Sequence, residues 1–579
     1  MAETTRTQKE GSHKKAQKAQ NSFRKILCLF VAIPFSCLLG LLLTAGIIAG
    51  QDITIQDLRN GFKDPSRWLS YSGDYTSQRH SPLTQITPAN VNRLAAQWTF
   101  QTDLSPFMST GRPGGLQSVP LVIDGVLYLA GTHNNVFAID ARTGRQIWRY
   151  QHEMPADVPP FTTRGVTRGL AVLGNKLFLG TLDAHMVALD IKTGKVIWDT
   201  LIEDYKKYFS VTSAPLVISN DKVITGIGGG DRGAYRFFID AYDTETGKRL
   251  WRSYTVPAEG EPGSETWAGK SVLRAGGATW TTGSYDPELN LVYWGTGNPY
   301  GASESRLGDN LYTASMIALD GDTGKLRWYY QVVPHDIHDY DADVVPIVAG
   351  LRIGGQIRKT LLFAPKIGYL YVLDRTNGKF LAAYPMSEFA KNWAKEIAPD
   401  GRPVTLVEDG TRCLPDINGA TNYWPPSYDS SLGLFFVTLH DTCQVFNAGI
   451  PGQIPGVPGN WSIGGPGYAA LRAFDPVTGK EKWEYRFPPS IFGLTGVSPA
   501  RIARGVGLAG GITTTASGLL FTGDSEGNFI AFDSRTGKPL WHYQTGSPVW
   551  GSAPVTYMLD GKQHVLIASG LTLMDFTLR

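Results

Sequence analysis

The chain has 579 residues, of which 42% are hydrophobic and 18% charged, with 66 glycines, and this composition excludes a disordered protein. The formal net charge is +3, but the first 25 residues carry seven basic and two acidic side chains, which leaves about −2 on the rest. A basic surface for nucleic acid is therefore not indicated.

The N-terminus predicts a membrane segment. After a basic segment over residues 1–25, residues 26–50 contain no charged side chain. Twenty-five helical residues at about 1.5 Å each exceed the roughly 30 Å of a bilayer core. The basic flank favours a cytoplasmic N-terminus, which predicts one transmembrane helix in the inner membrane and a periplasmic remainder. The alternative is a cleaved signal peptide, whose apolar region is usually only about 7–15 residues long.

After a linker over residues 51–64, one unit recurs along the chain. It consists of an apolar strand, an aspartate, a Thr-Gly or Asn-Gly turn and, in all but one copy, a tryptophan. Such a turn between alternating apolar residues is typical of a β-hairpin. Another short strand precedes most copies, so each unit has about four strands. The copies are centred on Asp140, Asp190, Asp243, Asp320, Asp374, Asp475 and Asp533.

The two ends of this region predict an eighth unit. It combines "RLAAQWTFQ" near Trp98 with "APVTYMLDGKQHVLIASG" over residues 553–570. Pairing the first strand with the last closes a ring and removes its free edges. The sequence therefore predicts an all-β fold: an eight-bladed β-propeller over residues 65–579 with Trp-docking-type blade repeats, preceded by one N-terminal transmembrane helix. Uneven spacing of the units predicts long loops, and such loops commonly build the functional site.

One of these loops carries "PHDIHDYDADVVP", residues 334–346, with four aspartates and two histidines. Because carboxylates at this density repel one another, a bound cation or a special task is expected. In an extended segment Asp339 and Asp341 point the same way, so both can face one cation. The spacing of His335 and His338 could suggest zinc. The oxygen-rich surroundings favour a hard cation instead, with the histidines as hydrogen-bonding loop residues.

The cysteines give limited information. Two lie in the apolar run, whereas Cys413 and Cys443 lie outside it. In an oxidising compartment these two would pair and stabilise the fold by about 3–4 kcal/mol. The sequence has no C-x-x-C-H motif, so a covalently attached c-type haem is not indicated.

The repeats, together with "TRGLAV", "GGATWTTGSYDPELNLVYWGTGNP", "RLGDNLYTASMIALD" and "PHDIHDYD", resemble the quinoprotein dehydrogenases that use pyrroloquinoline quinone (PQQ). The resemblance covers roughly residues 65–570. It implies a cofactor lying flat over a tryptophan in the centre of the ring, bridged to carboxylates by a cation. It also implies a structural bridge between Cys413 and Cys443.

Several positions match the family's cofactor-binding residues. Trp280 matches the stacking tryptophan, Arg168 an arginine facing the cofactor carboxylates, and Lys366 a basic residue reaching the quinone oxygens. An indole face suits a planar quinone, and a guanidinium fork binds two oxygens. The other positions that the resemblance assigns to the cofactor are Gln117, where the family commonly has glutamate, Thr212, Gly229, Gly230, Asn422 and Trp550.

The resemblance assigns the metal to Asp231, Asn298, Asp339 and Asp341, with Asp339 also the catalytic base. The family usually has glutamate where this chain has Asp231. In the alcohol-oxidising branch an extra aspartate at the position of Asp341 marks enzymes that use lanthanides. In the membrane glucose dehydrogenase branch a similar D-x-D occurs without that meaning. Ca2+ and a lanthanide ion are therefore both expected candidates.

The implied function is oxidation of an alcohol, polyol or sugar hydroxyl, with membrane quinone or a cytochrome c as the electron acceptor. The alternative is a membrane-tethered β-propeller that acts as a binding or assembly scaffold without cofactor. A third reading is a family member that has lost activity. It draws on Gln117, on Asp231, and on Thr162 and Thr163, which stand where the alcohol-oxidising branch has two adjacent cysteines.

Overall fold

The computed structural model describes residues 52–102, 115–159, 165–269, 273–406, 412–447, 460–461, 467–489, 510–549 and 551–579. Residues Asp52–Arg579 form one compact unit. Within the described ranges, no helix has the length and hydropathy needed to cross a membrane. The predicted basic segment and transmembrane helix lie outside these ranges and stay predictions. Part of the predicted linker forms helix α2 (Ile55–Asn60), and Leu58 of this helix is buried.

The fold is all-β and of the propeller type, built mainly from antiparallel four-stranded sheets. Most of them are formed by consecutive strands, as the repeat predicts. The first four are β3 (Leu121–Ile123), β4 (Val126–Ala130), β5 (Asn135–Asp140) and β6 (Gln146–Gln151); β7 (Ala171–Leu173), β8 (Lys176–Gly180), β9 (His185–Asp190) and β10 (Val196–Leu201); β11 (Leu216–Ile218), β12 (Lys222–Gly226), β13 (Phe238–Asp243) and β14 (Arg249–Tyr254); and β15 (Ser284–Asp286), β16 (Leu291–Gly295), β17 (Ser315–Asp320) and β18 (Leu326–Gln331).

The sheets that follow carry longer insertions and additional strands. They are β19 (Ile347–Ile353), β20 (Gln356–Phe363), β21 (Tyr369–Asp374) and β22 (Phe380–Pro385); β25 (Leu414–Pro415), β26 (Ser427–Asp429), β27 (Leu434–Gln444), β30 (Gly467–Phe474) and β31 (Glu481–Arg486); β1 (His80–Ser81), β32 (Thr513–Thr515), β33 (Leu519–Gly523), β34 (Asn528–Asp533) and β35 (Pro539–Gln544); and β2 (Leu94–Gln101), β36 (Val555–Leu559), β37 (Lys562–Ser569) and β38 (Thr572–Leu578). The insertions contain helix α4 (Ala390–Trp393) and the strand pairs β23 (Ala394–Ile397) with β24 (Pro403–Thr405) and β28 (Phe446–Asn447) with β29 (Asn460–Trp461).

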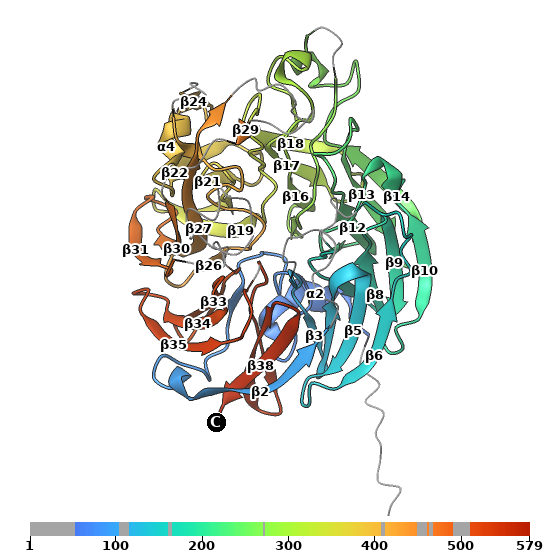
Figure 1. The fold of residues 1–579 in the computed structure, drawn as a ribbon, viewed down its shortest axis with the longest axis vertical. Coiled ribbons are helices and arrows are strands. Elements are labelled where there is room, and N and C mark those ends of the chain that lie inside the picture. The colour runs from blue at the N-terminus through green and yellow to red at the C-terminus, as the bar shows by residue number, and fades with distance from the viewer. Residues whose placement is uncertain are drawn as a thin grey trace, which may run out of the picture. The chain divides into compact units, whose positions relative to one another are not determined.

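Burial follows the position of a strand in its sheet. Strands β3 and β8 are buried along their whole length, whereas β6 and β10 alternate between exposed and partly buried residues. Figure 1 places the fourth strands β6, β10, β31 and β35 at the periphery of the unit. Neighbouring sheets cover both faces of the inner strands, which explains their continuous apolar sequences.

The repeated tryptophan and glycine connect one sheet to the next. Trp148 Nε1 donates to Ile191 O at 3.1 Å, and a Cβ at Gly194 would lie 2.6 Å from the Trp148 ring. The aspartate of each repeat accepts the backbone N–H groups of its own turn, as Asp190 does from Thr193 at 2.8 Å. In the repeat that lacks tryptophan, Tyr384 donates to Val477 O at 2.6 Å and packs on Gly479. The same pairing joins Trp98 to Ala141 and Gly144, Trp198 to Thr244 and Gly247, Trp251 to Gly321 and Gly324, Trp328 to Arg375 and Gly378, and Trp483 to Ser534 and Gly537.

We expect this tryptophan contact to contribute strongly to stability. Trp328 is 8% exposed, and its ring lies against Gly378 of the next sheet. Replacing it with alanine should lower the free energy of unfolding by about 3–5 kcal/mol, because a large buried ring and a hydrogen bond are lost. Ile147→Ala, at a residue 53% exposed on β6, is the control and should change stability little. Equal urea midpoints for the two variants would contradict the role of the contact.

The two ends of the propeller region meet in one sheet, as predicted. Strand β2 pairs antiparallel with β38, with Leu94 opposite Leu578. The closing strand lies beyond residue 570, at which the predicted eighth unit ended. The segment over residues 65–81, which precedes β2, contacts several sheets near their first strands. Trp68 forms a β-bridge with Val122, and Arg79 donates to Ile512 O at 2.9 Å and to Pro554 O at 2.8 Å.

Candidate functional site

The acidic stretch forms the loop between β18 and β19, and its backbone is unusual at Asp339. This residue has φ of +63°, a left-handed conformation that few non-glycine residues adopt. Such conformations persist where the surroundings enforce them, and they concentrate at functional sites. His335 Nδ1 lies 2.8 Å from Gly308 O, and the His338 ring packs 4.7 Å from that of Phe446. Both histidines thus have structural contacts in the loop.

Lys366, on the turn between β20 and β21, lies among these carboxylates. Its Nζ is 2.7 Å from Asp341 Oδ2 and 3.3 Å from Asp339 Oδ1, and it donates to Asp339 O at 2.8 Å. Burial lowers the pKa of Lys366, but Asp339 and Asp341 outweigh burial and raise that pKa above its ordinary value. The lysine therefore stays charged. Burial raises the pKa of Asp339 well above its usual range, with Lys366 opposing the rise.

Three polar side chains converge beside this lysine. The Asn298 amide lies 3.1 Å from Asp231 Oδ1 and 3.2 Å from Asp341 Oδ1, and the backbone N–H of Asn298 donates to Asp341 Oδ1 at 2.9 Å. With the amide NH2 facing the carboxylates, it donates to both of them. With the amide oxygen facing them, three oxygens point at one position, and such a set fits a hard cation.

A glycine makes the approach of Asp341 possible. A Cβ at Gly297, in the "GTGNP" motif, would lie 2.9 Å from Asp341 Oδ1 and would displace this carboxylate. Among the described residues, no three His, Cys, Asp or Glu side chains gather closely enough to form a metal site by themselves. The structure therefore brings together two carboxylates and an amide. Asp339, the fourth predicted ligand, is connected to them through Lys366.

Trp280 forms an aromatic surface next to this group. Its ring is half-buried, and the Arg168 guanidinium lies 4.9 Å from the centre of the Trp280 ring and 4.9 Å from that of Tyr423. Arg168 donates to Trp280 O at 2.9 Å, and Thr212 Oγ1 donates to the same oxygen at 3.0 Å. The structure thus joins Trp280, Arg168 and Thr212. Sequence reasoning missed Tyr423, although it directly follows Asn422.

The remaining predicted cofactor residues differ in their surroundings. Gln117 is buried, and no described residue forms a hydrogen bond with its Oε1, so the acceptor capacity of this amide oxygen is unused within the described residues. In contrast, Asn422 uses its amide locally, donating to Asn418 O at 2.8 Å and accepting from Tyr423 N at 2.9 Å. Trp550, Thr162 and Thr163 lie outside the described ranges.

Gly229 and Gly230 have a packing reason to be glycine. Gly229 has φ of +105°, and a Cβ there would lie 1.9 Å from Tyr208 O. A Cβ at Gly230 would lie 2.7 Å from Ala278 Cβ. These close approaches explain both residues without a ligand, so their predicted contact with a cofactor stays a prediction.

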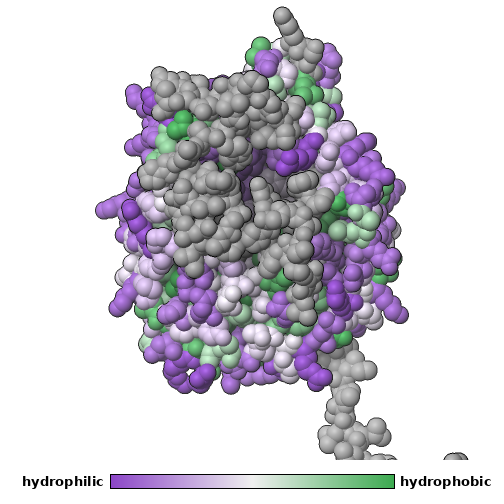
Figure 2. Space-filling view, in the orientation of Figure 1, coloured by the Kyte–Doolittle hydropathy of each residue, from purple (hydrophilic) through white to green (hydrophobic). Residues whose placement is uncertain are grey.

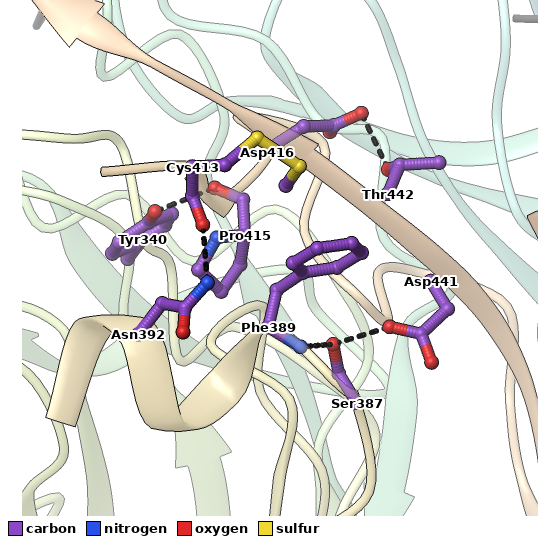
Figure 3. Close-up of a disulfide and its surroundings, with 10 residues drawn as sticks. Tyr340, Ser387, Phe389, Asn392, Cys413, Pro415, Asp416, Asp441 and Thr442 are labelled. Carbon is purple, nitrogen blue, oxygen red and sulfur yellow. Dashed lines mark hydrogen bonds between the residues drawn. A yellow bond between two sulfur atoms is a disulfide. The ribbon is translucent and has the colours of Figure 1, made fainter. Parts of the chain in front are cut away.

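A disulfide lies beside the strand that contacts the acidic loop (Figure 3). Cys413 and Cys443 are bonded, as predicted, and link the residue before β25 to β27. Tyr340, which lies between Asp339 and Asp341, donates to Pro415 O at 2.5 Å. A hydrogen bond also connects β27 to the residue that follows β25, because Thr442 donates to Asp416 Oδ2 at 2.7 Å.

We expect loss of this disulfide to destabilise the protein measurably. The bond closes a loop with a sequence separation of 30 residues. By loop-closure entropy, replacing both cysteines with alanine should lower the free energy of unfolding by about 3–4 kcal/mol. Thermal unfolding of the variant should be insensitive to dithiothreitol, whereas reductant should lower the melting temperature of the wild type. An unchanged wild-type melting temperature after complete reduction would contradict this.

The arrangement fits PQQ and a hard cation. A planar quinone that carries carboxylates requires an aromatic surface, a guanidinium and hydrogen-bonding groups. Trp280, Arg168 and Gln117 provide them, and Gln117 Oε1 has no hydrogen-bond partner within the described part of the chain. A Ca2+ or lanthanide ion requires oxygen ligands, which Asp231, Asn298 and Asp341 provide. Figure 2 shows hydrophilic surface in a hollow near the middle of the face toward the viewer.

Comparison with known proteins agrees with this reading. The model of the family described as "PQQ: Glucose/ethanol/alcohol dehydrogenase, beta-propeller domain" matches residues 68–392 and 453–565. The quinoprotein alcohol dehydrogenase PedH of Pseudomonas putida is 35% identical, covering 92% of this chain and 91% of that protein. The lanthanide-dependent methanol dehydrogenase of Methylacidiphilum fumariolicum is 32% identical, covering 88% and 85%.

Solved structures give the same result. The quinohemoprotein alcohol dehydrogenase ADHIIG of Pseudomonas putida superimposes with a TM-score of 0.79 and 31% identity, covering 90% of this chain and 82% of that one. A europium-containing methanol dehydrogenase superimposes with a TM-score of 0.80 and 30% identity, covering 90% of this chain and 100% of that one.

Proposed function

Because this chain belongs to the family of PQQ-dependent glucose/ethanol/alcohol dehydrogenases with a β-propeller domain, we propose that its central site oxidises a hydroxyl group with PQQ and a hard cation. It is an oxidoreductase that acts on the CH–OH group of alcohols. The observation that carries the proposal is the convergence of Asp231, Asn298 and Asp341 beside Lys366 and Asp339. A scaffold without cofactor gives no reason for carboxylates and an amide to face one point.

The side chains divide into three roles. Asp231, Asn298 and Asp341 would hold the cation, and Trp280, Arg168, Thr212 and Gln117 would hold the cofactor. When bound, PQQ would supply a two-electron acceptor and the cation a Lewis acid. Asp339 accepts the hydroxyl proton at its carboxylate as the general base. Lys366 keeps this carboxylate oriented, since its Nζ contacts both the backbone oxygen and Oδ1 of Asp339.

The proposal includes an eight-bladed propeller held outside the cytoplasm. The number of repeats, with the eighth sheet formed by the two ends of residues 65–579, supports eight blades. The basic residues before the apolar run over 26–50 support an anchor in the inner membrane with a periplasmic catalytic domain. Because the sequence has no C-x-x-C-H motif, electrons leave to a separate acceptor, membrane quinone or a cytochrome c.

The proposal is tested by reconstitution of the full chain in detergent. The purified protein is incubated with PQQ and either Ca2+ or a lanthanide, and dye reduction is measured across alcohols, polyols and aldoses. We expect turnover that requires both PQQ and a cation, and alcohols should be among the substrates. If no combination gives turnover and no quinone absorbance stays with the protein after gel filtration, the scaffold reading replaces this one.

A further inference from the structure

The last aspartate of the acidic stretch contacts the segment that carries Trp280. Asp343, 1% exposed, accepts the backbone N–H of Trp280 at 2.5 Å and that of Thr281 at 3.0 Å through Oδ2. Its Oδ1 accepts the Thr281 hydroxyl at 2.5 Å. One carboxylate therefore fixes the backbone beneath the indole ring, and it lies two residues after Asp341.

The first aspartate of the stretch holds the backbone on both sides of Asp339. Asp336, also 1% exposed, accepts the N–H of His338 at 2.9 Å through Oδ1 and the N–H of Tyr340 at 2.7 Å through Oδ2. The enclosed residue, Asp339, is the one with φ of +63°. Two hydrogen bonds to a buried carboxylate can maintain a conformation that is otherwise unfavourable.

We propose that Asp336 and Asp343 are positioning residues of the same site: Asp336 fixes the carboxylate of Asp339, and Asp343 fixes the height of Trp280 relative to the cation ligands. This inference rests on the proposed function. It gives each of the four aspartates of the stretch a role. Asp339 and Asp341 act on the substrate and the cation, whereas Asp336 positions Asp339 and Asp343 positions Trp280. Asp343 connects segments 63 residues apart in the chain, so it ties the cofactor surface to the metal-binding loop.

The two aspartates have different chemical requirements. At Asp336 both partners are backbone N–H groups, so both acceptor oxygens are needed, and the NH2 of an asparagine would face a donor. At Asp343 the partner of Oδ1 is the Thr281 hydroxyl, which can accept as well as donate. An asparagine there keeps its oxygen toward Trp280 and Thr281 and donates its NH2 to the hydroxyl. Asparagine is thus expected to be tolerated at 343 but not at 336.

The role of Asp343 is tested by the affinity for PQQ. PQQ is titrated into the protein in calcium-free buffer, and binding is measured by the change in tryptophan fluorescence. We expect Asp343→Ala to raise the dissociation constant for PQQ at least about tenfold, because three hydrogen bonds beneath the indole are lost. Asp343→Asn should restore most of the affinity. Glu259→Ala, at an exposed turn, is the control. A purely structural role would lower the urea midpoint of Asp343→Ala and leave its PQQ affinity at the wild-type value, and that result would overturn the inference.

Asp336 is tested by kcat per bound PQQ, with PQQ content measured by absorbance. We expect both Asp336→Ala and Asp336→Asn to lower kcat by up to about 100-fold with PQQ affinity within a few-fold of wild type, because misplacement of a catalytic group by about 1 Å has effects of this size. Wild-type kcat in Asp336→Asn would overturn the inference for this residue. If the wild type itself neither binds PQQ nor turns over, the proposed function fails. If the wild type does both and the variants match it, only the inference fails.

Discussion

Asp339→Asn is expected to lower kcat by about 10²–10⁴-fold, the range that a general base contributes. Asparagine has the same shape as aspartate but cannot accept the substrate proton. It also tolerates a left-handed backbone, so the φ of +63° at this position is preserved. Lys366 keeps its ion pair with Asp341 at 2.7 Å, and the surrounding site should stay intact.

The decisive comparison is between chemistry and binding. PQQ content after gel filtration and the affinity for the cation should stay within a few-fold of wild type, while turnover in the dye-linked assay is lost. Asp221→Asn, on an exposed turn, is the matched control for removal of one carboxylate. Turnover of Asp339→Asn at the wild-type rate, with full PQQ content, would remove Asp339 from its role as base.

The second large effect is expected at Asp341, on the identity of the metal. Asp341→Ala removes one oxygen of the convergent set and the ion partner of Lys366. The Coulomb energy of a trivalent ion with one carboxylate is half again that of a divalent ion at the same distance. We therefore expect the dissociation constant to rise by about 30-fold for a lanthanide and by about tenfold for Ca2+, since every 1.4 kcal/mol corresponds to tenfold.

Terbium luminescence excited through tryptophan measures this directly, and Ca2+ is measured by competition. Asp341→Asn is the informative companion variant, because it keeps an oxygen ligand and removes only the charge. It should lie between wild type and Asp341→Ala for terbium. Equal losses of affinity for both ions in Asp341→Ala would show that this carboxylate does not select the metal.

Much of the fold follows from the repeated Asp, Gly and Trp positions. The aspartate accepts hydrogen bonds from its own turn, and the tryptophan packs on the glycine of the next sheet, as Trp148 does on Gly194. Both contacts recur along the chain. Because the same contact is encoded several times, the pattern is visible in one sequence. The replacement by Tyr384 was not foreseen, because a single hydrogen bond to Val477 O leaves no pattern.

The candidate site is less predictable because its contacts join distant segments only once. The resemblance identified Trp280, Arg168, Asn298 and Asp341, and the structure pairs Trp280 with Arg168 and Asn298 with Asp341. It gave no indication that Tyr423 also packs against Arg168, with its ring centre 4.9 Å from the guanidinium. Nor does a sequence reveal which oxygen of Asp343 meets which donor, since that depends on how two loops pack.

The measurement that tests the central claim most directly is a crystal structure of the chain reconstituted with PQQ and terbium, with anomalous difference density used to locate the metal. We expect one strong peak between Asp231, Asn298 and Asp341, and PQQ lying flat on Trp280 with Arg168 at its edge. A peak elsewhere, or a hub whose side chains leave no space for PQQ over Trp280, would contradict this account.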